Sequence, residues 1–214
     1  MTLCCNDVMI SAHIVSSASR LVALILLVAL SGCAATQVES RGELLRGPLC
    51  QPGSPPVSAV IYWAPQWRVD QKEPVRRELA ALRGIQDFAA RTDCLAVRGI
   101  HRLSATQPLS NDAELQRLPG GGPDAPALLL LVVVRELGPR IEIGLPWVLE
   151  GGTEASIDVR VLDTRTATRL ANTQTLWRNG GRWVIKGVST LDRDMSAALT
   201  ATLMAPPASA TSTP

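Results

Sequence analysis

The chain has 214 residues, of which 21 are Lys or Arg and 19 are Asp or Glu, so its formal net charge at pH 7 is only +2. A charge so close to zero implies neither a nucleic-acid footprint nor a polybasic membrane patch. We therefore expect no nucleic-acid partner. Lys72 and Lys186 are the only lysines, which argues against lysine-based phosphate binding and Schiff-base chemistry.

The first feature along the chain is a short apolar run after Arg20 that ends in Leu30-Ser31-Gly32-Cys33. About ten apolar residues in a helix span roughly 15 Å, half of the hydrocarbon core of a bilayer, so a transmembrane anchor is poorly supported. A positive residue, a short apolar core and small residues at its end are typical of a secretory signal. We predict a signal peptide over residues 1–32, with translation starting at Met1 or Met9.

The tetrapeptide Leu30-Ser31-Gly32-Cys33 resembles the lipobox of bacterial lipoprotein signal peptides. The resemblance implies cleavage before Cys33, a diacylglycerol on its sulfur and usually a third acyl chain on its amine. Two or more acyl chains attach a protein stably to a membrane, whereas one chain does so only marginally. Ala34, where an inner-membrane retention signal would have Asp, favours the periplasmic face of the outer membrane. The alternatives are ordinary cleavage after Ala34, which would release the protein, and retention at the inner membrane.

Three segments follow the signal peptide. Glycines and prolines interrupt residues 33–56, which we predict to be a flexible tether that holds the domain away from the membrane. Residues 57–204 are enough for one periplasmic domain with a real core. Residues 205–214 have little apolar surface to bury, and we predict a disordered tail.

The pattern of the domain begins with a β-α-β unit. We expect a strand over 57–63, a helix over 73–91 and a second strand over 95–103. Pro74 suits the first turn of the helix, whose apolar residues recur every three or four positions.

The rest of the domain is predicted to be antiparallel strands and a closing helix. Leu128–Val134 is continuously apolar, as in a strand that is buried on both faces. We interpret Glu150-Gly151-Gly152, Asp163–Thr166 and Gly180-Gly181 as turns. The expected elements are a short helix at 112–118, strands at 128–134, 141–145, 155–161 and 170–177, and a helix at 191–204. The sequence thus predicts an α+β fold: a single domain in which a β-α-β unit is followed by antiparallel strands and a C-terminal helix packed on one mixed sheet.

This layout resembles a group of uncharacterised proteobacterial lipoproteins over about residues 57–203. The resemblance is carried by Ala127–Leu130, Glu150–Thr153, Val161–Thr166 and the closing helix, although Ala167 replaces the usual turn glycine. More loosely, the layout is similar to envelope lipoproteins related to the curli-secretion pore subunit and the peptidoglycan-synthase activators. This resemblance implies a non-enzymatic binding or assembly factor of the cell envelope. Its expected partner is an envelope protein or the peptidoglycan machinery. The alternatives are an accessory lipoprotein of a lipid or solute transport system and a hydrolase.

No catalytic, cofactor or metal site is predicted. His101 is the single histidine after residue 32, and one histidine with separated cysteines cannot supply the clustered ligands of a zinc site. The loop Leu118–Pro123 lacks the Gly-Lys-Ser/Thr ending of a phosphate-binding loop. We therefore expect a protein that is not an enzyme and needs no cofactor.

Tryptophan concentrates at contact hot spots, so the five tryptophans are candidate contacts. Trp63 and Trp177 are expected in the core. Trp147, beside Pro146, is the candidate for a contact with a partner protein.

A disulfide between Cys50 and Cys94 is predicted, because these are the two free thiols left once Cys33 is lipidated. The periplasm oxidises such pairs, and a β-α-β unit brings both strand entrances to one end of the sheet. The bridge would stabilise the fold by roughly 4 kcal/mol on the chain-entropy model. Maleimide labelling of denatured, unreduced protein should then modify neither cysteine. Two labelled cysteines would support the alternative of unpaired thiols.

Overall fold

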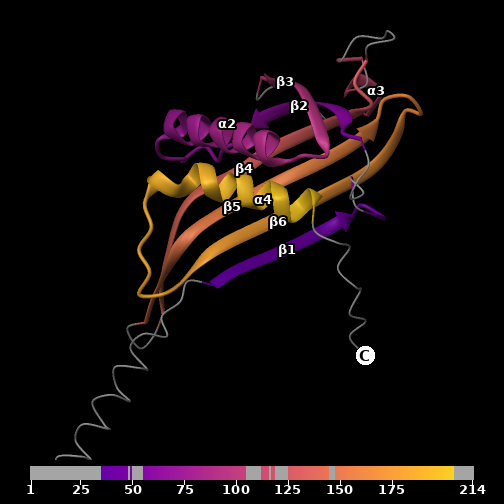
Figure 1. The fold of residues 1–214 in the computed structure, drawn as a ribbon. Coiled ribbons are helices and arrows are strands. Elements are labelled where there is room, and N and C mark those ends of the chain that lie inside the picture. Colours follow the sequence, from indigo (N-terminus) through magenta and orange to yellow (C-terminus); the bar gives the residue numbers. More distant parts are fainter. Residues whose placement is uncertain are drawn as a thin grey trace, which may run out of the picture.

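The computed structural model of the protein describes residues 35–47, 49, 55–104, 112–115, 117–118, 125–144 and 148–204. Within these ranges six strands form one mixed sheet, in the spatial order β1-β6-β5-β4-β2-β3. Two helices lie side by side on one face of this sheet (Figure 1). The structure confirms the predicted α+β class, with one mixed sheet and a C-terminal helix packed on it. The predicted signal peptide (1–32) and tail (205–214) lie outside the described residues.

The expected β-α-β unit is present. Its elements are β2 (Val57–Pro65), α2 (Pro74–Arg91) and β3 (Leu95–Arg102). β2 runs parallel to β3 on one side and to β4 on the other. Val57 pairs with Leu95, and its backbone N–H donates a hydrogen bond of 2.9 Å to the carbonyl oxygen of Cys94. The entrances of β2 and β3 therefore lie at the same end of the sheet.

The three strands that follow form an antiparallel meander that is longer than predicted. They are β4 (Leu128–Gly144), β5 (Val148–Asp163) and β6 (Thr168–Arg182). The separate strand expected at 141–145 is the second half of β4, which continues past Gly138. A β-bulge between Val134 and Glu136 shifts the alternation by one residue, so that Val134 and Leu137 both belong to the core. Because the bulge changes the side-chain pattern without ending the strand, the sequence pattern suggests a break that does not exist.

The interpretation of Glu150-Gly151-Gly152 and Gly180-Gly181 as turns is wrong. These glycines pair inside β5 and β6, Gly151 with Gly181 and Gly152 with Gly180. A Cβ atom on Gly151 would overlap the carbonyl oxygen of Val184, and one on Gly180 would overlap the carbonyl oxygen of Gly151. Glycine is required at these positions because neighbouring backbones approach too closely for a side chain. Close approach of backbones is a common reason for glycine within a strand.

The turn between β5 and β6 lies where the sequence predicts it, at Asp163–Thr166. The carboxylate of Asp163 accepts backbone hydrogen bonds from Arg165 at 2.8 Å and Thr166 at 3.2 Å. Burial acts to raise the pKa of Asp163, but these donors outweigh it and hold the pKa below its ordinary value. Ala167 has a φ of 58°, in the left-handed region that favours glycine. The turn thus keeps its shape at a strain of about 1 kcal/mol.

The structure contradicts part of the flexible tether predicted for residues 33–56. β1 (Ala35–Glu43) is an edge strand, antiparallel to β6, and all its side chains are exposed. The hydroxyls of Ser40 and Thr175 add a hydrogen bond of 3.0 Å to the backbone pairing. An exposed edge strand buries no apolar face, so its sequence looks like that of a polar linker.

The main apolar core lies between the sheet and the helices. α2 and α4 (Leu191–Leu203) pack against each other on this face, and the short 3-10 helix η1 (Val188–Thr190) leads into α4. Trp63 and Trp177 are buried in this core, as predicted. No helix among the described residues is long and apolar enough to cross a membrane.

A smaller apolar cluster lies on the other face of the sheet. It contains Leu115 of α3 (Asp112–Leu115) and alternate residues of β2 and β4. Its strand residues on β2 and β4 are Val60, Tyr62, Ala64, Leu129, Leu131 and Val133, and β5 adds Leu162. The two clusters together explain the continuous apolar run Leu128–Val134, because β4 is buried on both faces.

Gly84 is the point of closest approach between α2 and α4. A Cβ atom there would lie 2.5 Å from both the carbonyl oxygen of Asp192 and the Cβ of Met195. We expect Gly84→Val to lower the free energy of unfolding by about 3 kcal/mol, because overpacking forces the helices apart. Denaturant titration measures this, with Gly187→Val as the control, since nothing lies within 4 Å of a Cβ at Gly187. Equal stability of the two variants would contradict the prediction.

Candidate functional site

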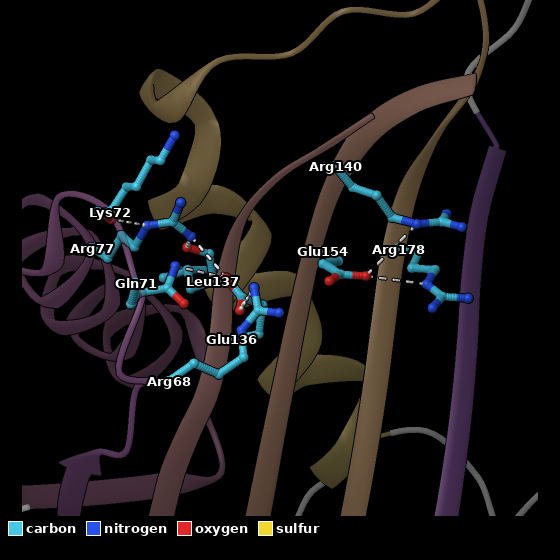
Figure 2. A network of polar contacts seen from close by, with 9 residues as sticks. All are labelled: Arg68, Gln71, Lys72, Arg77, Glu136, Leu137, Arg140, Glu154 and Arg178. Carbon is cyan, nitrogen blue, oxygen red and sulfur yellow. Dashed lines mark hydrogen bonds and ion pairs between the residues drawn. The ribbon is translucent and has the colours of Figure 1, made fainter. Parts of the chain in front are cut away.

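A network of charged side chains joins the loop before α2 to strand β4 (Figure 2). Its centre is Glu136, at the β-bulge. The Nη1 atom of Arg77 lies 2.8 Å from Oε1 of Glu136, and Nη2 of Arg68 lies 3.1 Å from Oε2. Nε2 of Gln71 donates a further hydrogen bond of 3.0 Å to Oε1. Three side chains of the β2–α2 region thus converge on one carboxylate.

Arg77 is the most buried member of this network, with 8% of its surface exposed. Its guanidinium also donates to two backbone carbonyl oxygens, those of Lys72 at 2.8 Å and Leu137 at 2.5 Å. A Cβ atom on Gly138 would overlap the guanidinium, so glycine makes room for it. Because the charge of Arg77 is buried, loss of its carboxylate partner would leave that charge uncompensated, so this part of the network has a structural role.

A second cluster lies on neighbouring strands of the same region (Figure 2). Oε2 of Glu154 on β5 lies 3.4 Å from Nε of Arg178 on β6 and 4.0 Å from Nε of Arg140 on β4. Arg140 also pairs with Glu142. The hydrogen bond from Arg140 lowers the pKa of Glu142, and the same bond raises the pKa of Arg140. The side chains of Glu154, Arg140 and Arg178 are more exposed than those of the Arg77–Glu136 pair.

The two clusters line one open groove of about 480 Å³. Its cationic residues are Arg68, Lys72, Arg77, Arg140 and Arg178, and its acidic residues are Asp70, Glu136, Glu142 and Glu154. Arginines engage three of these carboxylates, which leaves no pair of free carboxylates set for acid–base work. In the described part of the chain no group of three or more metal-ligating side chains comes together. The groove can therefore offer hydrogen bonds and charge to a polar surface.

A larger hollow of about 650 Å³ lies where β1 ends and where β2, β4 and β6 begin. Its apolar lining is formed by Leu44, Leu45, Leu49, Val57, Leu128 and Leu170, and its other lining residues are Glu43, Arg46, Gly47, Thr168 and Arg169. We call it the apolar cavity. Arg169 pairs with Glu43 and with Asp112, both at 3.0 Å. Arg46 makes no ion pair with any described residue. An apolar hollow with a cation at its wall suits an apolar segment that carries a negative group.

Three of the predicted site residues, Cys33, Cys50 and Trp147, lie outside the described residues. Lipidation, the disulfide and the partner contact therefore stay predictions. Cys94 directly precedes β3, at the end of the sheet where Val57 begins β2.

His101 lies on the edge strand β3, where its ring stacks on Tyr62 with a centroid distance of 5.2 Å. Burial raises the pKa of the Tyr62 hydroxyl. The imidazole of His101 thus packs on an aromatic ring, as a histidine with a structural role does.

Both clusters and both hollows escape prediction from the sequence. Arg77 and Glu136 are 59 residues apart, so no local spacing connects them. Trp183, with 68% of its surface exposed, is also missed. Its neighbours Arg182, Ile185 and Lys186 are the signal that could have identified it, because a tryptophan between basic residues is unusual in a core.

No protein-family model matches the chain, and no curated protein matches it in sequence. Among solved structures, the PelC dodecamer from Paraburkholderia phytofirmans is 13% identical at a TM-score of 0.38, over 80% of this chain and 99% of that one. Lipoprotein GNA1162 from Neisseria meningitidis is 14% identical at a TM-score of 0.36, over 68% and 96%. Protein XCC0632 from Xanthomonas campestris is 12% identical at a TM-score of 0.35, over 74% and 86%. Scores this low describe a loosely similar course of the chain and say nothing of this protein's activity or partners.

The buried ion pair leads to a prediction about stability. Glu136→Gln removes the negative charge opposite Arg77 and leaves the guanidinium buried without a counterion, so the free energy of unfolding should fall by about 3 kcal/mol. The control is Glu73→Gln, which breaks the exposed pair of Glu73 with Arg76 and should cost at most about 1 kcal/mol. Urea titrations of both variants measure the difference. If the two losses are alike, the buried pair does not join the helix layer to the sheet.

Proposed function

We propose that the chain is an envelope lipoprotein, anchored through lipidated Cys33 to the periplasmic face of the outer membrane, that acts without catalysis as a binding or assembly factor. The observation that carries this proposal is the tetrapeptide Leu30-Ser31-Gly32-Cys33. Strand β1 begins at Ala35, only two residues later. The anchor would therefore be joined to the folded sheet itself and not to a long linker.

The direction of β1 supports the apolar cavity as the site for a partner. Ala35 and Glu43 are the two ends of the strand, and Glu43 lines the cavity. Eight residue steps in a strand span about 27 Å. An anchor at Cys33 would thus hold the cavity well away from the lipid headgroups. The cavity would be open to another envelope component.

The chemistry of the cavity indicates what it would bind. Leucine and valine side chains form most of its wall, and Arg46 has no ion pair among the described residues. The partner that fits is an apolar segment of an envelope protein with a carboxylate near it.

A second candidate function is that of an accessory lipoprotein in a lipid or solute transport system. The apolar lining of the cavity favours it, because a hollow of this volume can also hold part of an acyl chain. The two functions differ in what occupies the cavity, which is a protein segment in one and a lipid or solute in the other.

The anchor is tested by mass spectrometry of the protein expressed in a Gram-negative cell. Mature protein should begin at Cys33 and carry the mass of a diacylglycerol. Cys33→Ala should accumulate as an unprocessed or mis-cleaved form. A wild-type mature protein that begins at Ala35 or Thr36 without lipid would refute the proposal.

The occupant of the cavity is tested with a photo-crosslinking residue at Leu170, which lines the cavity, and with the same residue at Leu79 of α2 as the control. A defined protein adduct at Leu170 and not at Leu79 supports the binding factor. A lipid adduct at Leu170 supports the transport function. Equal labelling at both positions would exclude the cavity as the site.

A further inference from the structure

One end of the sheet exposes four large apolar side chains. They belong to Ile141 and Ile143 at the end of β4, and to Trp183 and Ile185 just after β6, and we call them the apolar tip. Their exposed fractions are 57%, 80%, 68% and 73%. Singly exposed apolar residues are ordinary, but a group at one place on a surface marks a contact site.

Strand register brings the tip together. Ile143 pairs with Leu149 across the β4–β5 hairpin, and the backbone N–H of Trp183 donates a hydrogen bond of 2.8 Å to the carbonyl oxygen of the same Leu149. Ile141 pairs with Gly151, whose missing Cβ lets the carbonyl oxygen of Val184 approach. The segment that carries Trp183 and Ile185 is therefore held against the end of the hairpin that carries Ile141 and Ile143.

The backbone at Trp183 is strained. Its φ is 61°, in the left-handed region that bulky side chains avoid at a cost of about 1–2 kcal/mol. Core packing does not repay this strain, because the indole is mostly exposed. Strain that the fold maintains at an exposed aromatic residue is typical of a functional contact.

The tip lies beside the expected attachment point of the lipid. Ala35 pairs with Gly180, three residues before Trp183. Two residues of chain span at most about 7 Å, so Cys33 is held within that distance of Ala35. At this end of the sheet the acyl chains on Cys33 and the apolar tip would meet the same bilayer.

The charges around the tip suit a headgroup layer. Arg182 and Lys186 flank Trp183 and Ile185 in sequence. Lys186 donates to Asn179, and Arg182 forms no ion pair within the described ranges. Glu142 is neutralised by Arg140, while Glu150 is a carboxylate in the same region. Tryptophan with neighbouring basic residues is the combination that favours a membrane–water interface.

We propose that the apolar tip of Ile141, Ile143, Trp183 and Ile185 inserts into the headgroup region of the bilayer that holds the acyl chains of Cys33. This inference rests on the proposed anchor and adds a second point of contact to it. Two contacts on one bilayer fix the orientation of the sheet, whereas acyl chains alone leave the domain free to tilt. The apolar cavity at the far end of β1 is then directed away from the membrane.

The test measures the depth of labels on acylated, full-length protein in vesicles of phosphatidylethanolamine and phosphatidylglycerol. A nitrobenzoxadiazole label is placed through Ile143→Cys or Ile185→Cys. Val75→Cys on α2 is the matched control, because Val75 is 78% exposed and the tip positions are 80% and 73% exposed. Labelled parent protein gives the background from the native cysteines. An interfacial side chain lies roughly 5–10 Å into the headgroup and acyl boundary, within reach of a quencher on the acyl chains.

The fluorescence emission of both tip labels should shift to shorter wavelength when the protein binds vesicles. The acyl-chain quencher should reduce the emission of the tip labels several-fold more than that of the label at Val75. Vesicle-bound protein whose tip labels behave like the Val75 label would overturn the inference and leave the anchor standing. Tip labels that are shielded equally with and without vesicles would mean a protein contact between copies, which also overturns it. If wild-type protein purified from cells carries no acyl chains and does not bind the vesicles, the anchor and the inference are both overturned.

A second measurement avoids the labels and uses tryptophan fluorescence with brominated lipids. Trp183→Phe should lose part of the lipid quenching, and Trp67→Phe should retain it, since Trp67 packs against the core. Unchanged quenching in Trp183→Phe would overturn the proposed role of Trp183.

Discussion

Backbone pairing between β1 and β6 decides how the domain stands relative to the residue proposed to carry the lipid. The ladder runs from Ala35 opposite Gly180 to Glu43 opposite Asn172. Because β1 begins two residues after Cys33, the end of the sheet at Ala35 is the one next to the proposed anchor. The apolar cavity lies at the other end of the strand, at Glu43. A free linker would let the sheet take many positions relative to Cys33, whereas a paired strand restricts the sheet to one.

The two charged clusters along the polar groove have different physical roles, and burial decides which role each has. The Arg77–Glu136 pair is nearly closed off from water, so its charges depend on each other and on the backbone carbonyls around them. Glu154 and its two arginines are more exposed, so solvent screens them and they contribute little to stability. The first cluster connects α2 to β4, whereas the second links side chains of β4, β5 and β6 at a more solvated surface.

Departures from local sequence rules gather at the end of the sheet near Ala35. Gly151 and Gly180 lie inside strands, Trp183 has a left-handed backbone, and Ile143 and Ile185 are exposed. Each of these costs some free energy in an isolated domain. Natural proteins concentrate such departures at functional sites. The bilayer proposed to hold the lipid on Cys33 would supply an apolar environment that offsets them.

The sequence by itself determined the α+β class, the β-α-β unit, α4 and the burial of Trp63 and Trp177, because periodic apolar patterns are local and long elements satisfy them fully. Tertiary structure alone decided β1, the length of β4, the in-strand role of Gly151 and the convergence of three side chains on Glu136. An edge strand with no buried face has no apolar period, and a bulge changes the period within one strand. Contacts such as Arg77 with Glu136 join residues far apart in the chain, so they exist only once the strands have paired.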